Sequence, residues 1–100
     1  MARTLPEFQK NLSPAAATLE QLGKLVRNRR AQSRLRIDDA ASLSGVSSDV
    51  LSRLENGKPV TADKLILVLE SLGLRILVVP KTEIPAIEAV LDQSAPSEGR

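Results

Sequence analysis

The chain has 100 residues, with 14 Lys and Arg against 12 Asp and Glu, and it contains neither cysteine nor histidine. A chain of this length forms one small domain, and the missing residue types exclude disulfides, Cys/His metal sites, thiol nucleophiles and histidine bases. Because a glycine-rich phosphate loop is also missing, we expect a protein that is not an enzyme and needs no cofactor. Neither a secretory signal nor a bilayer-spanning apolar run is recognisable, so we expect a cytoplasmic, nucleoid-associated protein without a membrane partner.

Positive charge is concentrated in the first half of the chain. A stretch of basic residues without any acid consists of Lys24, Arg27, Arg29, Arg30, Arg34 and Arg36. Acidic residues gather instead at Asp38 and Asp39 and in the segment after Lys81. This distribution favours a polyanionic partner, and an ordinary solvated helix face is the alternative.

The N-terminal part predicts an arm followed by a helix. Residues 1–12 are mixed in character, and Pro6 disfavours a continuous helix there. Ser13 and Pro14 are typical of a helix start, as the capping residue and the first helical residue. An apolar period near 3.6 then predicts a helix from residue 15 to about residue 32.

Three shorter helices are expected over residues 37–44, 48–56 and 62–72. Ser47 and Thr61 are good N-caps for the second and third of these, and a glycine follows each of the three. Asp38 and Asp39 fall in a first turn, where the helix dipole favours negative charge. On the last helix, the residues expected to face inward are Leu65, Ile66, Val68, Leu69 and Leu72.

Residues 74–79 form the one segment whose composition favours a strand, since they are apolar, rich in β-branched residues and bounded by Gly73 and Pro80. A lone strand leaves its backbone unpaired, so we expect it to pair with the same strand of a second copy. The dimerisation residues would be Leu74, Ile76 and Val78. A short helix or a packed apolar tail is the alternative. Residues 80–100 are expected to form a flexible acidic tail with at most two amphipathic turns.

A small residue, a glycine and two aliphatic residues at fixed spacing indicate a helix-turn-helix. Ala41 lets two helices approach closely, and Gly45 permits the tight turn four residues later. Val46 is expected to fill the base of the turn, and Leu51 and Leu54 to lie on the inner face of the next helix. That helix is then the one that enters the major groove of DNA.

Around these positions the sequence resembles the Cro/C1-type (Xre) helix-turn-helix family of bacterial and phage repressors. The matching residues are Leu22-Gly23, Val26-Arg27, Arg30, Leu35, Ala41, Gly45-Val46-Ser47 and the run from Leu51 to Lys58. The resemblance implies an all-α, lambda-repressor-like domain of four helices within residues 13–79, which here ends in the β-strand 74–79. Four helices and a dimerising strand are similar to the HipB antitoxins, which repress their own operon and bind a HipA-type kinase toxin.

The resemblance also implies which residues contact DNA. Arg53 would donate to guanine and Asp49 would accept from cytosine N4, while serine, asparagine and lysine side chains nearby would contact phosphates. The family commonly has Thr-Gln where this chain has Arg36-Ile37, and a glycine at Arg34, so these two arginines would supply charge instead. The complete predicted set is Arg34, Arg36, Ser47, Ser48, Asp49, Ser52, Arg53, Asn56 and Lys58.

Two further residues are assigned to structure rather than to DNA contact. In the family, an arginine late in the first helix commonly pairs with the glutamate that follows the recognition helix. The resemblance therefore implies a structural pair of Arg30 and Glu55. The function expected from the whole sequence is a homodimeric repressor that binds a double-stranded DNA operator, and within that class an antitoxin. A free-standing regulator is one alternative. A protein-interaction module that has lost DNA binding is another, because Ile37 cannot make the usual glutamine contact.

Overall fold

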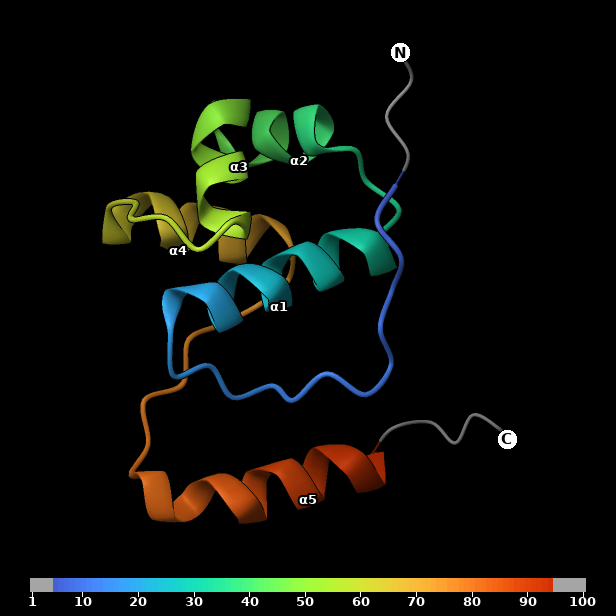
Figure 1. The fold of residues 1–100 in the computed structure, drawn as a ribbon, viewed down its shortest axis with the longest axis vertical. Helices are drawn as coiled ribbons and strands as arrows, with labels where there is room; N and C mark the ends of the chain where they lie inside the picture. The colour runs from blue at the N-terminus through green and yellow to red at the C-terminus, as the bar shows by residue number, and fades with distance from the viewer. Residues whose placement is uncertain (1–4, 95–100) are drawn as a thin grey trace.

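The structure, a computed structural model, describes residues 5–94. Within this range the helices are α1 (Leu19–Gln32), α2 (Ile37–Ser44), α3 (Ser48–Glu55), α4 (Ala62–Ser71), the 3-10 turn η1 (Lys81–Glu83) and α5 (Ile84–Ser94). The first four helices form one body, α5 lies in a separate layer, and the extended residues 5–18 run between the two (Figure 1). None of the helices in the described range is long and apolar enough to cross a bilayer.

The core of the four-helix body is aliphatic. Its fully buried large side chains are Val26, Leu51, Leu54 and Val68. Half-buried residues of α1, α2 and α4 surround them, including Leu22, Ile37 and Leu65. Each buried aliphatic side chain contributes about 1.5–3 kcal/mol, so this cluster holds α3 in place against α1 and α2, the two helices that it contacts most.

The helix starts follow the predicted caps at two positions and differ at one. Ser47 caps α3, because its Oγ accepts from Val50 N at 3.1 Å, and Thr61 is the N-cap of α4. The Thr61 side chain hydrogen-bonds to Asp63 and lowers the pKa of that carboxyl below its ordinary value. α1, however, begins after Thr18 and not near residue 15. The predicted cap, Ser13, donates its hydroxyl to Glu88 Oε2 of α5 at 2.6 Å.

The first four helices end with the same backbone arrangement, in which two N–H groups bond back into the last turn. Its central residue has a positive φ, which is 76° at Gly45. At the end of α1 the same position is occupied by Arg34, with φ 57°. An L-residue in this left-handed conformation costs roughly 1–2 kcal/mol relative to glycine. Arg34 is therefore a strained position.

Arg34→Gly is expected to stabilise the protein by about 1 kcal/mol, because the strain is removed while glycine loses some extra backbone entropy on folding. For a domain of this size the melting temperature should rise by roughly 4–8 °C, which calorimetry measures directly. Arg34→Ala is the matched control, since it removes the same charge but keeps a Cβ. Equal melting temperatures for the two variants would contradict the explanation by strain.

The C-terminal third departs most from the sequence prediction. Residues 74–79 form no strand within residues 5–94 of the single chain, so the predicted β-strand is not found there, and its pairing with the same segment of a second copy stays a prediction. Residues 84–94 form the helix α5 of 11 residues, longer than the one or two turns expected in a flexible tail, and residues 95–100 of that tail lie outside the described range. On α4, Ile66 is 51% exposed and does not face inward.

Candidate nucleic-acid interface

α2, the turn at Gly45 and α3 form the helix-turn-helix that the residue spacing predicts. Ala41, Leu51 and Leu54 are all at most 2% exposed and make up the seam between the helices. Val46 packs half-buried against the same core. The five positions from which the motif is predicted are thus confirmed as its buried seam and its turn, and they fix the pose of α3.

The first turn of α3 carries polar groups. Asp49 is exposed, and Ser48 is half-buried beside α2, where its Oγ donates to Asp38 Oδ1 at 2.8 Å. Ser47 has its Oγ engaged as the helix cap. Because the N-terminal residues of a recognition helix contact base edges, this turn is the part of the interface best placed to read sequence.

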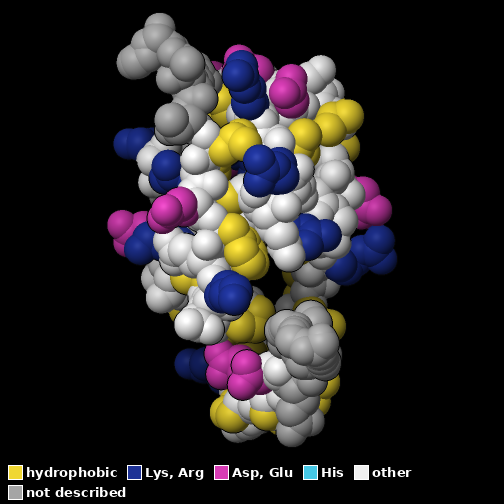
Figure 2. All heavy atoms as spheres, turned by 90° about the vertical axis from the view of Figure 1, so that its right-hand side faces the viewer, with side chains coloured by type: hydrophobic (Ala, Val, Ile, Leu, Met, Phe, Trp, Pro, Cys, Tyr) yellow, Lys and Arg dark blue, Asp and Glu magenta, His cyan; other side chains and the backbone are white. Residues whose placement is uncertain are grey.

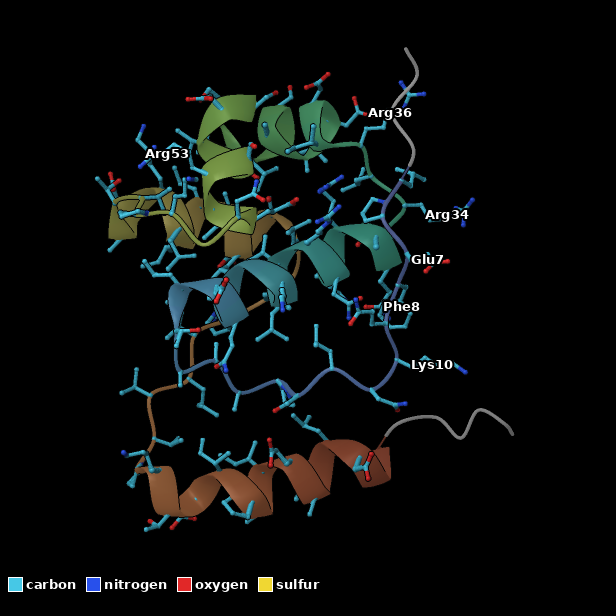
Figure 3. All side chains as sticks on the ribbon, in the orientation of Figure 1. Glu7, Phe8, Lys10, Arg34, Arg36 and Arg53 are labelled. Carbon is cyan, nitrogen blue, oxygen red and sulfur yellow. The ribbon has the colours of Figure 1, made fainter. Side chains whose placement is uncertain are left out.

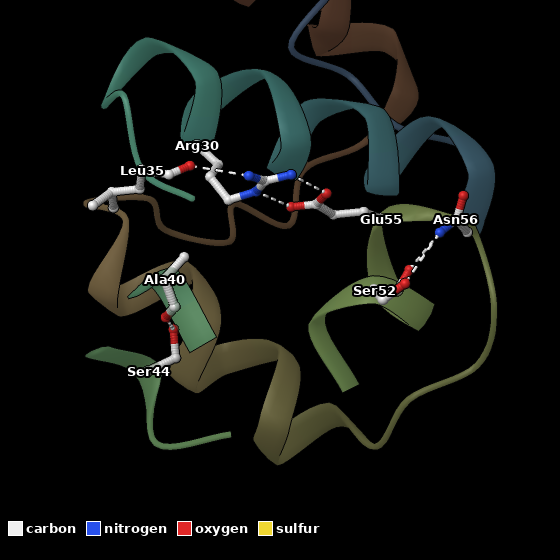
Figure 4. Close-up of polar contacts among 7 residues, drawn as sticks. All are labelled: Arg30, Leu35, Ala40, Ser44, Ser52, Glu55 and Asn56. Carbon is white, nitrogen blue, oxygen red and sulfur yellow. Dashed lines mark hydrogen bonds and ion pairs between the residues drawn. The ribbon is translucent and has the colours of Figure 1, made fainter. Parts of the chain in front are cut away.

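Polar side chains at the far end of α3 bond back to their own chain. Arg53 Nη2 donates to Pro59 O at 2.8 Å, and Asn56 Nδ2 donates to Ser52 O at 2.8 Å (Figure 4). Lys58 follows in the exposed loop. The contact with Pro59 holds Arg53 on the outer side of α3 (Figure 3), and a guanidinium group has further N–H donors to offer a base.

Arg30 and Glu55 form the buried pair that the resemblance implied. Arg30 Nε lies 2.6 Å from Glu55 Oε2, and Arg30 Nη2 donates to Glu55 Oε1 at 2.8 Å (Figure 4). A third bond joins Arg30 Nη1 to Leu35 O at 3.0 Å. Both side chains are at most 7% exposed. One arginine therefore connects the end of α1, the connection between α1 and α2, and the end of α3.

A polar hollow of about 240 Å³ lies beside this pair. It is lined by Arg27, Arg30, Arg36, Ile37, Ser52, Glu55 and Asn56. Arg27 and Arg36 are exposed and come from different elements, so two guanidinium groups share one concave surface with an amide and a hydroxyl group. This composition suits a DNA phosphate. Arg27 was missing from the predicted set, although it lies one helical turn before Arg30.

Arg34 does not join this surface. Its side chain projects from the connection between α1 and α2, well away from Arg53 (Figure 3). On the face that contains this connection, basic side chains are separated by apolar and acidic ones (Figure 2). Most of the predicted DNA-contacting residues thus lie on or next to α3, and Arg36 lies beside them in the hollow. Arg34 lies apart from this group.

The buried seam and the polar outer face of α3 define a helix-turn-helix DNA-binding domain. The chain belongs to the helix-turn-helix domain family, whose sequence profile matches residues 21–74, from α1 to just beyond α4. No curated protein matches the chain significantly. Membership in this family makes sequence-specific DNA binding and transcription regulation the function class of the protein.

Proposed function

We propose that the protein is a homodimeric transcriptional repressor that acts by binding an operator rather than by catalysis. The observation that carries this proposal is the outer face of α3, where Asp49 and Arg53 are exposed while Leu51 and Leu54 hold the helix from within. The hollow lined by Arg27 and Arg36 supports it as a phosphate contact beside the recognition helix. In a dimer, two such helices would read half-sites about one helical turn apart.

The proposal places dimerisation in residues 74–79. Ile76, Leu77 and Val78 are 46%, 69% and 90% exposed, which is costly for consecutive apolar residues in water. Leu74, by contrast, packs on its own core, so Ile76 and Val78 carry the contact. Val78→Lys should shift the mass measured by analytical ultracentrifugation from dimer to monomer, whereas Thr82→Lys, also exposed, should leave the dimer intact. A monomeric wild type would refute the homodimer.

An antitoxin is the biological role proposed within this class. Supporting it are the short DNA-binding domain, the exposed segment 74–79 and the amphipathic α5, whose Val90 and Leu91 remain 60% and 49% exposed. The partner would be a kinase-like toxin encoded beside the gene. Sequencing the flanking DNA tests this directly. A neighbouring reading frame without kinase character would leave a free-standing repressor as the function.

Arg53 and Lys58 should make contributions of different kinds to DNA binding. An arginine that donates to a guanine contributes roughly 1–3 kcal/mol of discrimination, whereas a lysine near a phosphate contributes affinity without sequence preference. Arg53→Ala is therefore expected to relax the preference at one base pair. Lys58→Ala should weaken binding to every sequence by a similar factor. Fluorescence anisotropy with an operator and its single-base variants separates the two, and uniform weakening by Arg53→Ala would argue against base reading.

The protein-interaction module remains the competing function, because Ile37 replaces a residue that can contact DNA. In the structure, Ile37 lines the same hollow as Arg27 and Arg36. These two arginines can supply the contact with DNA that Ile37 itself cannot make, which favours DNA binding over the interaction module. The double variant Arg27→Ala/Arg36→Ala should lose its affinity for DNA. It should keep its fold, because both side chains are exposed. Unchanged affinity would favour the interaction module.

A further inference from the structure

A hydrogen bond between the two helices of the motif sets the chemistry of one recognition-helix side chain. Ser48 is the first residue of α3, and Asp38 lies in the first turn of α2. Ser48 Oγ donates to Asp38 Oδ1 at 2.8 Å. A serine hydroxyl has a single proton, and a bond to an ionised carboxylate is stronger than one between neutral groups. Asp38 therefore uses the only hydrogen-bond donor of the Ser48 side chain.

With its proton committed, the Ser48 hydroxyl retains only acceptor capacity. Phosphate oxygens and the O6 and N7 atoms of guanine are themselves acceptors, so they gain nothing from this group. The exocyclic amino groups of cytosine N4 and adenine N6 are the donors that the major groove offers. A serine hydroxyl whose proton is not committed could hydrogen-bond with a donor or with an acceptor on a base edge, since it can rotate.

The side chain of the next residue, Asp49, also offers only hydrogen-bond acceptors. Asp49 is exposed on the first turn of α3 and, when ionised, accepts hydrogen bonds without donating any. Ser48 and Asp49 together thus present only acceptors from their side chains. Side-chain donors on α3 come later, at Ser52 and Arg53, about one helical turn further along.

We propose that Asp38 is a specificity-determining positioning residue, which holds the Ser48 hydroxyl as an acceptor so that the first turn of α3 selects a base with an exocyclic amino group. This inference rests on the proposed DNA-binding function. It moves Ser48 from phosphate contact, where the sequence placed it, to base reading. Asp38 itself acts through Ser48 and need not touch DNA.

The test compares base preferences. The full chain is used to select an operator from random DNA duplexes, and every base pair of the half-site is then substituted singly. Wild type should prefer cytosine or adenine at the Ser48 position by roughly fivefold, the effect of one ordinary hydrogen bond. Asp38→Ala should reduce this preference to within about twofold, because the freed hydroxyl can donate or accept.

Two companion variants separate specificity from simple structural damage. Asp38→Asn keeps an acceptor oxygen for Ser48, so it should preserve the preference even though a negative charge is lost. Ser48→Ala should erase the preference at the same base pair as Asp38→Ala, and the double variant should add nothing further. Loss of the Asp38 charge alone would change the affinity for all sequences equally. The ratio of affinities between operators that differ at one base pair would then stay the same.

The outcomes are distinguishable from a failure of the proposed function. If wild type selects no operator at all, DNA binding itself is refuted. If wild type selects an operator but Asp38→Ala keeps every base preference, the role of Asp38 is refuted and repression stands. A change at a base pair different from the one affected by Ser48→Ala would also overturn the proposal.

Discussion

Glu55→Ala is expected to lower the free energy of unfolding by about 3–5 kcal/mol, because it leaves the Arg30 guanidinium buried without its partner. The carboxylate accepts two bonds from Arg30, at 2.6 and 2.8 Å, in a site where both side chains are almost fully buried. A domain of this size has only about 5–15 kcal/mol of stability in total.

Urea denaturation followed by circular dichroism measures this loss. Glu70→Ala is the matched control, because Glu70 pairs with Arg75 at 3.3 Å on the surface, where both side chains are more than half exposed. A surface pair of this kind contributes at most about 1 kcal/mol. Replacing both buried partners, with Arg30→Met and Glu55→Leu, should recover much of the stability. If Glu55→Ala and Glu70→Ala unfold at the same urea concentration, the buried pair has been misassigned.

Gly23→Ala is expected to destabilise the protein by roughly 1–3 kcal/mol, although the helix propensity of alanine alone would favour it by about 1 kcal/mol. A Cβ on Gly23 would lie 2.7 Å from Glu55 O and 2.9 Å from Glu55 C, and it would also meet Leu54 O. These are backbone atoms at the end of α3, so the whole helix would have to move.

The same displacement should weaken DNA binding, because Gly23 sets the spacing between α1 and the recognition helix. The free energy of unfolding and the operator affinity are therefore expected to fall together. Lys24→Ala, at the adjacent exposed position of α1, serves as the control and should leave stability nearly unchanged. A Gly23→Ala protein more stable than wild type would show that propensity outweighs the close approach.

The helix-turn-helix could be predicted from the sequence because its determinants are local. Within a few residues, Ala41 allows close approach of two helices, Gly45 permits the left-handed turn, and Leu51 marks the buried face of the next helix. The start of α1 could not be predicted in the same way. Two capping residues, Ser13 and Thr18, compete in an alanine-rich segment, and the contact of Ser13 with Glu88, 75 residues away, is invisible to local patterns.

Much of the candidate site depends on how the helices cross. The pair of Arg30 and Glu55 was found through the family resemblance, not through spacing. Arg27 enters the hollow only because α1 and the start of α2 converge there, and the bond from Ser48 to Asp38 exists only because the tight turn brings two first turns together. The predicted strand 74–79 is not found in the single chain for a related reason, since its composition does not supply a partner edge, and the partner expected for it is a second copy.

The salt dependence of operator binding tests the central claim most directly. Duplex DNA from the region upstream of the gene is titrated with the protein at 50 and 200 mM salt. A dimer that neutralises about six phosphates should lose roughly a thousandfold in affinity over this interval. Arg27, Arg36 and Lys58 are the cations expected to account for the slope. Binding that is absent at both concentrations, or unchanged between them, would contradict a DNA-binding repressor.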